Sequence, residues 1–95
     1  MKNYEIMFIV KTTISEDEVK SVVKKFQDVL TTDGAKINNF NEMGQRELAY
    51  EIKKLKNGFY FVIDCDANDT TIKEFDRLAL IDSNIIRHII INKEK

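Results

Sequence analysis

The stretch Asn57–Asp66, NGFYFVIDCD, places a turn signal directly before an apolar strand. Asparagine followed by glycine accepts positive backbone φ angles at little steric cost, so Lys56-Asn57-Gly58 predicts a hairpin turn. From Phe59 to Cys65, apolar side chains occupy both alternating sets of positions, which is typical of a strand buried on both faces of a sheet. We therefore expect an interior strand here, with its neighbours supplied by the rest of the chain.

The segments on either side of this strand also have strand patterns. Residues 35–54 alternate apolar and polar side chains, with a shift of phase and an interruption at Gly44, which predicts a long strand with a bend or bulge. Tyr4, Ile6, Phe8 and Val10 alternate at the strand period, and Met7 and Ile9 make the other face apolar as well, as an interior strand requires. Residues 85–91 are rich in β-branched side chains and predict the last strand.

Two capping-box patterns separate these strands. Ser15-Glu16-Asp17-Glu18 can satisfy the free amides of a first helix, and Gly34 is a natural stop for it. Thr71 and Glu74 repeat the same spacing for a second helix. The apolar residues at helical spacing are Val19, Val22, Val23, Phe26, Val29 and Leu30 in the first helix, and Ile72, Phe75, Leu78, Ala79 and Ile81 in the second.

The resulting order, β-α-β-β-α-β, predicts the ferredoxin-like α+β fold, in which an antiparallel four-stranded sheet carries both helices on one face. The first and third strands should lie in the middle. A chain of 95 residues has room for one compact core, so we expect a single domain over residues 1–95.

Two helices can cover only one side of this sheet, yet both sides of the central strands are apolar. We therefore expect the uncovered side to meet a partner. The candidates for this partner-facing surface are Met7, Ile9, Phe59 and Phe61.

Charge is distributed unevenly along the chain, although the formal net charge is only −1. Residues 44–58 and 83–95 each carry a net charge of +2, whereas residues 59–82 carry −4. The near-neutral total disfavours nonspecific binding to polyanions, while the basic segments favour local contact with phosphates.

Cysteine content and hydropathy indicate a cytoplasmic protein. The lone Cys65 can form no internal disulfide and excludes a multi-cysteine metal site, which agrees with a reducing compartment. No apolar run approaches the length of a membrane span, and the N-terminal segment lacks the apolar stretch of a signal peptide.

Residues 57–64 match part of the RNA-recognition strand motif, which reads basic, glycine, aromatic, small, aromatic, aliphatic, any, aromatic. The match holds at Gly58, Phe59, Phe61 and Val62 and fails at the basic, small and last aromatic positions. The first strand also lacks the partner motif. Packing inside a sheet is therefore favoured over a platform for stacked bases.

No group of residues indicates an enzyme. Residues 64–69 begin like a calcium loop, but Asp69 stands where that loop needs glycine and Phe75 where it needs a bidentate glutamate. His88 and Cys65 lack a third group to orient them, and the sequence has no glycine-rich phosphate loop. We expect no catalytic residue, no metal, no cofactor and no small-molecule substrate.

The segment Gln45–Lys56 carries the richest recognition chemistry, because cations alternate with an aromatic side chain on a strand that ends in a hairpin. Cations at a hairpin tip can follow phosphates, and Arg46 can make a forked contact. The alternative is a solvated hairpin whose lysines discourage edge-to-edge aggregation. Composition alone favours this alternative.

This segment resembles the family of bacterial small-subunit ribosomal protein six, and the resemblance covers residues 1–93. The matching pieces are Met1-Lys2-Asn3-Tyr4-Glu5, Gly34-Ala35-Lys36-Ile37, Gly44-Gln45-Arg46-Glu47-Leu48-Ala49-Tyr50-Glu51-Ile52-Lys53-Lys54, Gly58-Phe59-Tyr60 and Ile85-Ile86-Arg87-His88. The resemblance implies the ferredoxin-like fold and a structural role in the small ribosomal subunit, in the cytoplasm. It also implies binding to the central domain of small-subunit (16S-type) ribosomal RNA together with a small basic partner, ribosomal protein eighteen. The residues it implies for RNA or partner contact are Lys2, Arg46, Tyr50, Lys53, Lys54 and Arg87, and Lys56 of the same basic segment is a further candidate.

Two other classes remain open. A ferredoxin-like domain can be a ligand sensor that dimerises through its open sheet. It can also be a small phosphate-handling enzyme, although this sequence lacks an anion loop with a nearby catalytic Asn or Arg.

Overall fold

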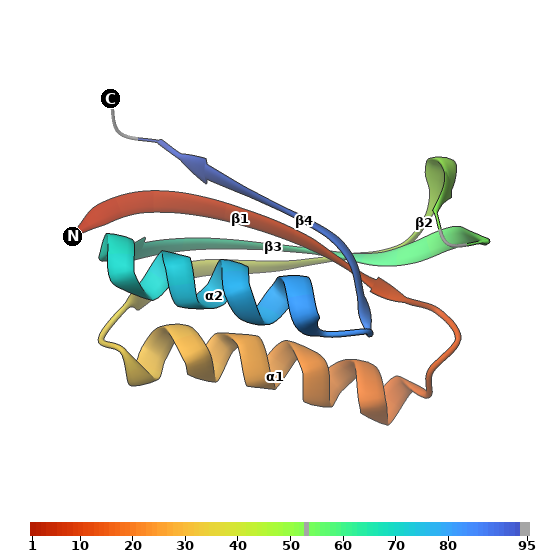
Figure 1. The fold of residues 1–95 in the computed structure, drawn as a ribbon, viewed down its shortest axis with the longest axis horizontal. Helices are drawn as coiled ribbons and strands as arrows, with labels where there is room; N and C mark the ends of the chain where they lie inside the picture. Colours follow the sequence, from red (N-terminus) through yellow and green to blue (C-terminus); the bar gives the residue numbers. More distant parts are fainter. Residues whose placement is uncertain (53, 94–95) are drawn as a thin grey trace.

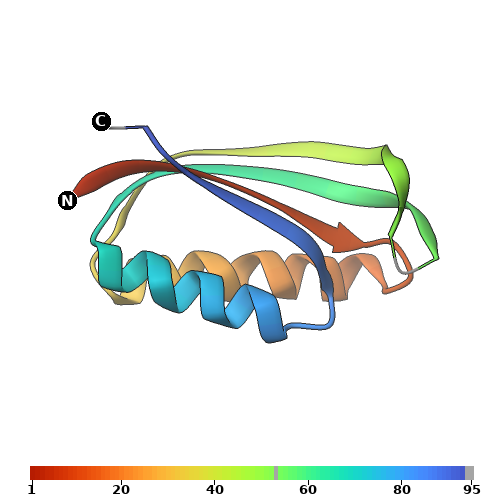
Figure 2. The same cartoon turned by 45° about the horizontal axis from the view of Figure 1, so that its top comes forward.

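The computed structural model describes residues 1–52 and 54–93 as a four-stranded antiparallel sheet with two helices packed on one face (Figure 1, Figure 2). The elements are β1 (Lys2–Lys11), α1 (Glu16–Thr32), β2 (Lys36–Ile52), β3 (Leu55–Ala67), α2 (Asp69–Ile81) and β4 (Ile85–Asn92). The strand order is β2-β3-β1-β4, so the first and third strands are central. The ferredoxin-like α+β fold is confirmed.

The register of β1 and β3 decides which side chains face the helices. Phe8 lies opposite Phe61 in the ladder, and both are buried in the helix-side core. The ring centroid of Phe8 lies 5.3 Å from that of Phe61, 6.0 Å from that of Phe26 in α1 and 6.3 Å from that of Phe75 in α2. An aromatic cluster at these separations therefore joins the central strands to both helices.

The two helices begin differently. At α1 the Ser15 side chain accepts a hydrogen bond from the backbone amide of Glu18 at 3.2 Å, which confirms the serine cap of the first predicted capping box. Gly34 follows α1 with a φ of +88°, which confirms the predicted stop. The second capping box is wrong, because α2 begins at Asp69 after Asn68, and Thr71 is buried inside the helix.

The end of α2 also differs from its predicted apolar stripe. Ile72, Phe75 and Ala79 are buried, but the side chain of Ile81 is 68% exposed, as is most of Leu80. Ile81 is the last residue of the helix, where α2 turns toward β4. Within the described residues, neither helix is both long and apolar enough to cross a membrane.

The predicted bend in the second strand is confirmed. β2 shifts register against β3 between Ile37 and Asn39, between Glu42 and Gly44, and beyond Glu47. Gly44 has a φ of +81°, a conformation that glycine adopts without steric cost. Beyond the last shift, the end of β2 leaves the plane of the sheet on the side away from the helices (Figure 1).

The hairpin turn lies earlier in the chain than predicted, because β2 ends at Ile52 and β3 begins at Leu55. Ile52 pairs with Leu55, and Lys54 between them has a positive φ of 65°. Asn57 and Gly58 are instead ladder residues of β3, opposite Glu47 and Arg46. The prediction of a turn at residues 56–58 is therefore wrong, and Gly58 has a packing role instead.

Candidate nucleic-acid and protein interface

The sheet face without helices, which we call the open face, carries the odd-numbered residues of β1. Met7 and Ile9 lie there, opposite Val62 and Tyr60 of β3. Met7 is half-buried, whereas Ile9 is only 4% exposed. The open face therefore has an apolar middle, as expected, although Ile9 is already covered.

Phe59 and Phe61 do not belong to this face. Phe61 is 5% exposed in the helix-side core, and Phe59 packs against the same core from the position opposite Val10. Phe61 also stacks on Phe40 of β2, with ring centroids 6.0 Å apart. The expectation that these two aromatic residues face a partner is corrected, because the register places them under α1.

Gly58 explains how Ile9 becomes buried. A Cβ atom at Gly58 would lie 2.3 Å from the Cγ2 atom of Ile9, and 3.6 Å from the Cδ1 atom of Ile86 in β4. The glycine therefore leaves the space that the Ile9 side chain occupies. Leu48 near the end of β2 is also buried, although neither Leu48 nor Ile9 belongs to the helix-side core.

The hairpin end of β2 reaches the opposite edge of the sheet. The Arg87 Nη1 atom of β4 donates a hydrogen bond to the Tyr50 hydroxyl at 2.5 Å. β2 and β4 are the two edge strands, with β3 and β1 between them. The contact therefore requires the end of β2, which rises from the sheet in Figure 1, to lie over the open face.

Most of the predicted cationic residues gather at this hairpin end. Arg46 lies opposite Gly58, and Gly58 lies opposite Lys11 of β1, so these three positions form a row across the sheet. Lys54 and Lys56 are exposed on the hairpin itself. Lys53, also predicted, lies outside the described residues.

Sequence reasoning missed Lys11. The sequence could have indicated it, because Lys11 follows Ile9 by two residues, and residues two apart on a strand lie on the same face of the sheet. Arg87 occupies the same end of the open face, opposite Ile9 in the ladder between β1 and β4. The structure thus brings Arg46, Arg87 and the hairpin lysines together with one unpredicted cation.

Lys2 lies at the other end of the sheet. It pairs with Ala67 in the ladder, and its Nζ atom is 3.9 Å from the Asp69 carboxylate. The Tyr4 hydroxyl also donates a hydrogen bond to Asp69 at 2.5 Å. That hydrogen bond, and then the charge of Lys2, lower the pKa of Asp69 below its usual range. Lys2 is thus separated from the other predicted cations.

An acidic network occupies this second end of the open face. The Asn3 side-chain amide donates to Asp64 at 2.8 Å and to Asp66 at 3.1 Å, and Lys93 donates to Asp64 at 3.1 Å. The hydrogen bond from Asn3, followed by that from Lys93, lowers the pKa of Asp64. The open face is therefore basic at the hairpin end and acidic at the end near the chain termini.

The residues considered for catalysis have structural environments. Cys65 is fully buried, and burial raises the pKa of its thiol to about 11, far from that of a reactive thiolate. His88 contacts the Asp76 carboxylate of α2 at 2.7 Å and so ties β4 to the helix layer. Cys65 pairs with Tyr4 of β1, whereas His88 pairs with Phe8, four residues further along that strand, so the structure does not bring the thiol and the imidazole together. Among the described residues, no group of three or more His, Cys, Asp and Glu side chains could hold a metal ion.

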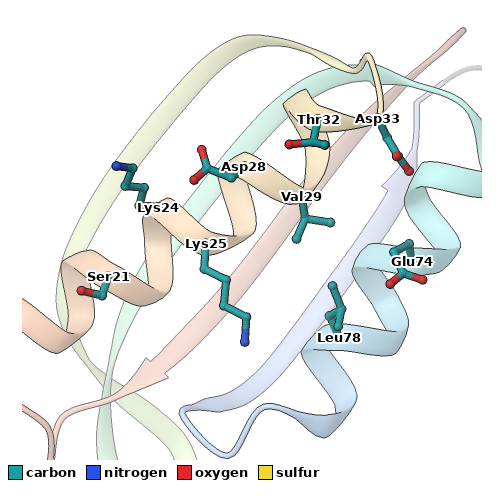
Figure 3. A pocket seen from close by; sticks show the side chains of 9 residues that line it. All are labelled: Ser21, Lys24, Lys25, Asp28, Val29, Thr32, Asp33, Glu74 and Leu78. Atoms are coloured by element: carbon teal, nitrogen blue, oxygen red, sulfur yellow. The ribbon is translucent and has the colours of Figure 1, made fainter.

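The helix layer also has a shallow groove of about 670 Å³ between α1 and α2. Val29 and Leu78 point into this space from the two helices, and Lys24 and Asp28 point away from it (Figure 3). Lys25 beside it pairs with Asp82 at 3.1 Å. The groove therefore presents a small apolar floor between paired and solvated charges.

These features define a ferredoxin-like domain with one covered sheet face and one open, charge-polarised face. The family model for ribosomal protein S6 matches residues 3–92, and this chain belongs to that family. A crystal structure of 30S ribosomal protein S6 from Thermotoga maritima superposes with a TM-score of 0.92 at 29% sequence identity, covering 97% of this chain and 87% of that one. The family is a structural component of the small ribosomal subunit and not an enzyme, so this chain is a small-subunit ribosomal constituent.

Proposed function

We propose that this protein binds the central domain of small-subunit ribosomal RNA cooperatively with ribosomal protein eighteen, in the cytoplasmic ribosome. The observation that carries the proposal is the composition of the open face, where an apolar middle adjoins a cationic hairpin end. Phosphates are the natural ligands of Arg46, Lys54 and Lys56, which are exposed at that end.

The net charge of this chain explains why a partner is needed. Phosphate neutralisation supplies much of the affinity for RNA, and a chain of net charge −1 supplies little of it overall. A small basic protein docked on the open face, around the half-buried Met7, would add cations next to the hairpin. The acidic network around Asp64 gives that partner a surface of opposite charge.

The direct test is a titration of a fluorescent RNA fragment of the central domain with this protein alone, with ribosomal protein eighteen alone, and with both. We expect tight binding only for the pair. Equal binding by the partner alone would refute the proposal. Dimerisation of this protein without RNA binding would favour the ligand-sensor alternative.

The RNA side of the interface is tested by Lys54→Ala combined with Lys56→Ala. Each lost phosphate contact removes roughly one unit from the slope of log affinity against log salt, so the slope should fall by up to about two. Lys20→Ala with Lys24→Ala on α1 is the matched control, because it removes the same charge from the helix layer. An unchanged slope in the hairpin variant would exclude these lysines from the RNA surface.

The protein side is tested by Met7→Gln, which makes the middle of the open face polar. Affinity for ribosomal protein eighteen should fall, measured by calorimetry without RNA. Leu80→Gln, an equally polar change at an exposed residue of α2, should leave it unchanged. Normal partner binding by a folded Met7→Gln variant would show that ribosomal protein eighteen does not dock around Met7.

A further inference from the structure

The hydrogen bond between Tyr50 and Arg87 joins residues from the two edge strands of the sheet, 37 positions apart in sequence. Both side chains are exposed, and Tyr50 retains 60% of its accessible surface. A core contact therefore does not bring them together. The fold of the hairpin across the open face does so.

Two apolar side chains of the sheet are buried outside the helix-side core. Ile9 is 4% exposed and Leu48 is 7% exposed, and neither belongs to that core. Ile9 occupies the space left by Gly58, with Ile86 beside it. The burial of Leu48, near the end of β2, favours the folded-over hairpin, and the Tyr50–Arg87 hydrogen bond joins the end of β2 to β4.

We propose that Tyr50 and Arg87 are positioning residues, forming a clasp that holds the β2–β3 hairpin across the open face before RNA binds. The clasp fixes Arg46, Lys54 and Lys56 relative to the sheet, and the inference rests on the proposed function of those cations. A free hairpin would lose conformational entropy when it bound phosphates, and a held hairpin has lost most of it on folding. The clasp therefore raises RNA affinity without itself contacting RNA.

This role differs from the one that the family resemblance implied for the same two residues. A direct phosphate contact by Arg87 would contribute about one unit to the salt slope. A positioning role changes affinity at every salt concentration and leaves the slope alone, because no counterion-releasing contact is lost. The two roles therefore separate in one salt titration.

The test substitution is Tyr50→Phe, which removes only the hydroxyl that accepts from Arg87. Its matched control is Tyr60→Phe, the same chemical change on the open face, opposite Ile9 and outside the clasp. The first readout is amide hydrogen exchange of the free protein, followed by NMR at residues 46–48 and 55–57. Exchange there should be faster in Tyr50→Phe, unchanged in Tyr60→Phe, and unchanged in the helix-side core in both.

The second readout is binding to the central-domain RNA fragment in the presence of ribosomal protein eighteen. Tyr50→Phe should bind about fivefold more weakly with an unchanged salt slope, the size expected from one hydrogen bond. Arg87→Gln should behave in the same way. Ser21→Ala, which removes a hydroxyl from the helix layer and leaves the open face intact, should match the wild type.

Several outcomes would overturn the clasp. Unchanged hairpin exchange in Tyr50→Phe would show that the contact does not hold the tip. If Arg87→Gln reduced the slope of log affinity against log salt by about one while Tyr50→Phe left RNA binding unchanged, Arg87 would be a direct phosphate ligand instead. If the wild-type pair failed to bind RNA, the proposed function would fall, and the exchange experiment would still decide whether the clasp exists.

Discussion

The two faces of the sheet use the same strands in different ways. The helix-covered face is built from large apolar side chains, with Phe8 at the centre of an aromatic cluster that includes Phe61. The open face has a narrow apolar middle, a basic end at the hairpin and an acidic end around Asp64. The helix-covered face therefore contains most of the core, and the open face carries the separated charges. Even-numbered residues of β1 lie on the first face and odd-numbered residues on the second.

The largest effect should come from truncating the centre of the covered face. Phe8→Ala should reduce the free energy of unfolding by about 3–5 kcal/mol, because it empties a site that is 0% exposed. Met7→Ala, the neighbour that faces the open side, should cost much less because Met7 is only half-buried. Urea unfolding measures both, and equal losses would contradict the division between the faces.

A smaller effect should come from the close packing within the open face. Gly58→Ala should cost about 1–3 kcal/mol, because its new methyl group would overlap the Cγ2 atom of Ile9. Ile9→Ala in the same chain removes that overlap, so the double variant should lose less stability than the two single losses added together. A urea-unfolding double-mutant cycle gives the coupling. Strict additivity would show that this contact is not the reason for glycine at position 58.

The smallest effect on stability should come from a substitution at the acidic end of the open face. The folded-state pKa of Asp64 is lowered, first by the Asn3 hydrogen bond and then by Lys93, so its charged form stabilises the fold. That contribution is complete above the unfolded pKa of about 3.9 and is lost as pH falls through the lower folded value. In acid titrations of stability, Asp64→Asn should therefore show a shallower decline below pH 4 than the wild type.

The control for this titration is Asp28→Asn, a carboxylate exposed on α1. It removes one carboxylate outside the hydrogen-bonded network around Asn3, so the two acid limbs are compared directly. Matching acid limbs for Asp64→Asn and the wild type would show that the network around Asn3 adds nothing to the pH dependence of folding.

Local sequence patterns predicted the elements well where the physical signal was itself local. The Ser15 cap and the glycine stop at Gly34 depend on neighbouring backbone amides and on one φ angle, so residues a few positions apart determine them. The second capping box failed because Thr71 could serve equally as a cap or as a buried helical residue, and the helix had already begun at Asp69. Propensity cannot choose between two compatible local patterns.

The sequence predicted which residues belong to the candidate site better than it predicted how they are arranged on the sheet. The hairpin cations were identified from sequence, but Lys2 was grouped with them although it lies at the far end of the sheet beside Asp69. Lys11 was missed, because its proximity to Arg46 depends on two ladder registers across Gly58. Register is a property of paired strands, and no single strand contains it.

The sequence by itself determined the order of elements, the bulged second strand and the presence of surplus apolar surface on the sheet. Those features follow from the periodicity of apolar side chains, from helix capping and from the glycine at position 44, which act over a few residues. Only the tertiary structure decided that Phe61 faces the helices while Ile9 fills the space above Gly58, because strands apolar on both sides give no sign of which side is covered. It also decided that Tyr50 meets Arg87, since that contact exists only when the hairpin crosses two intervening strands.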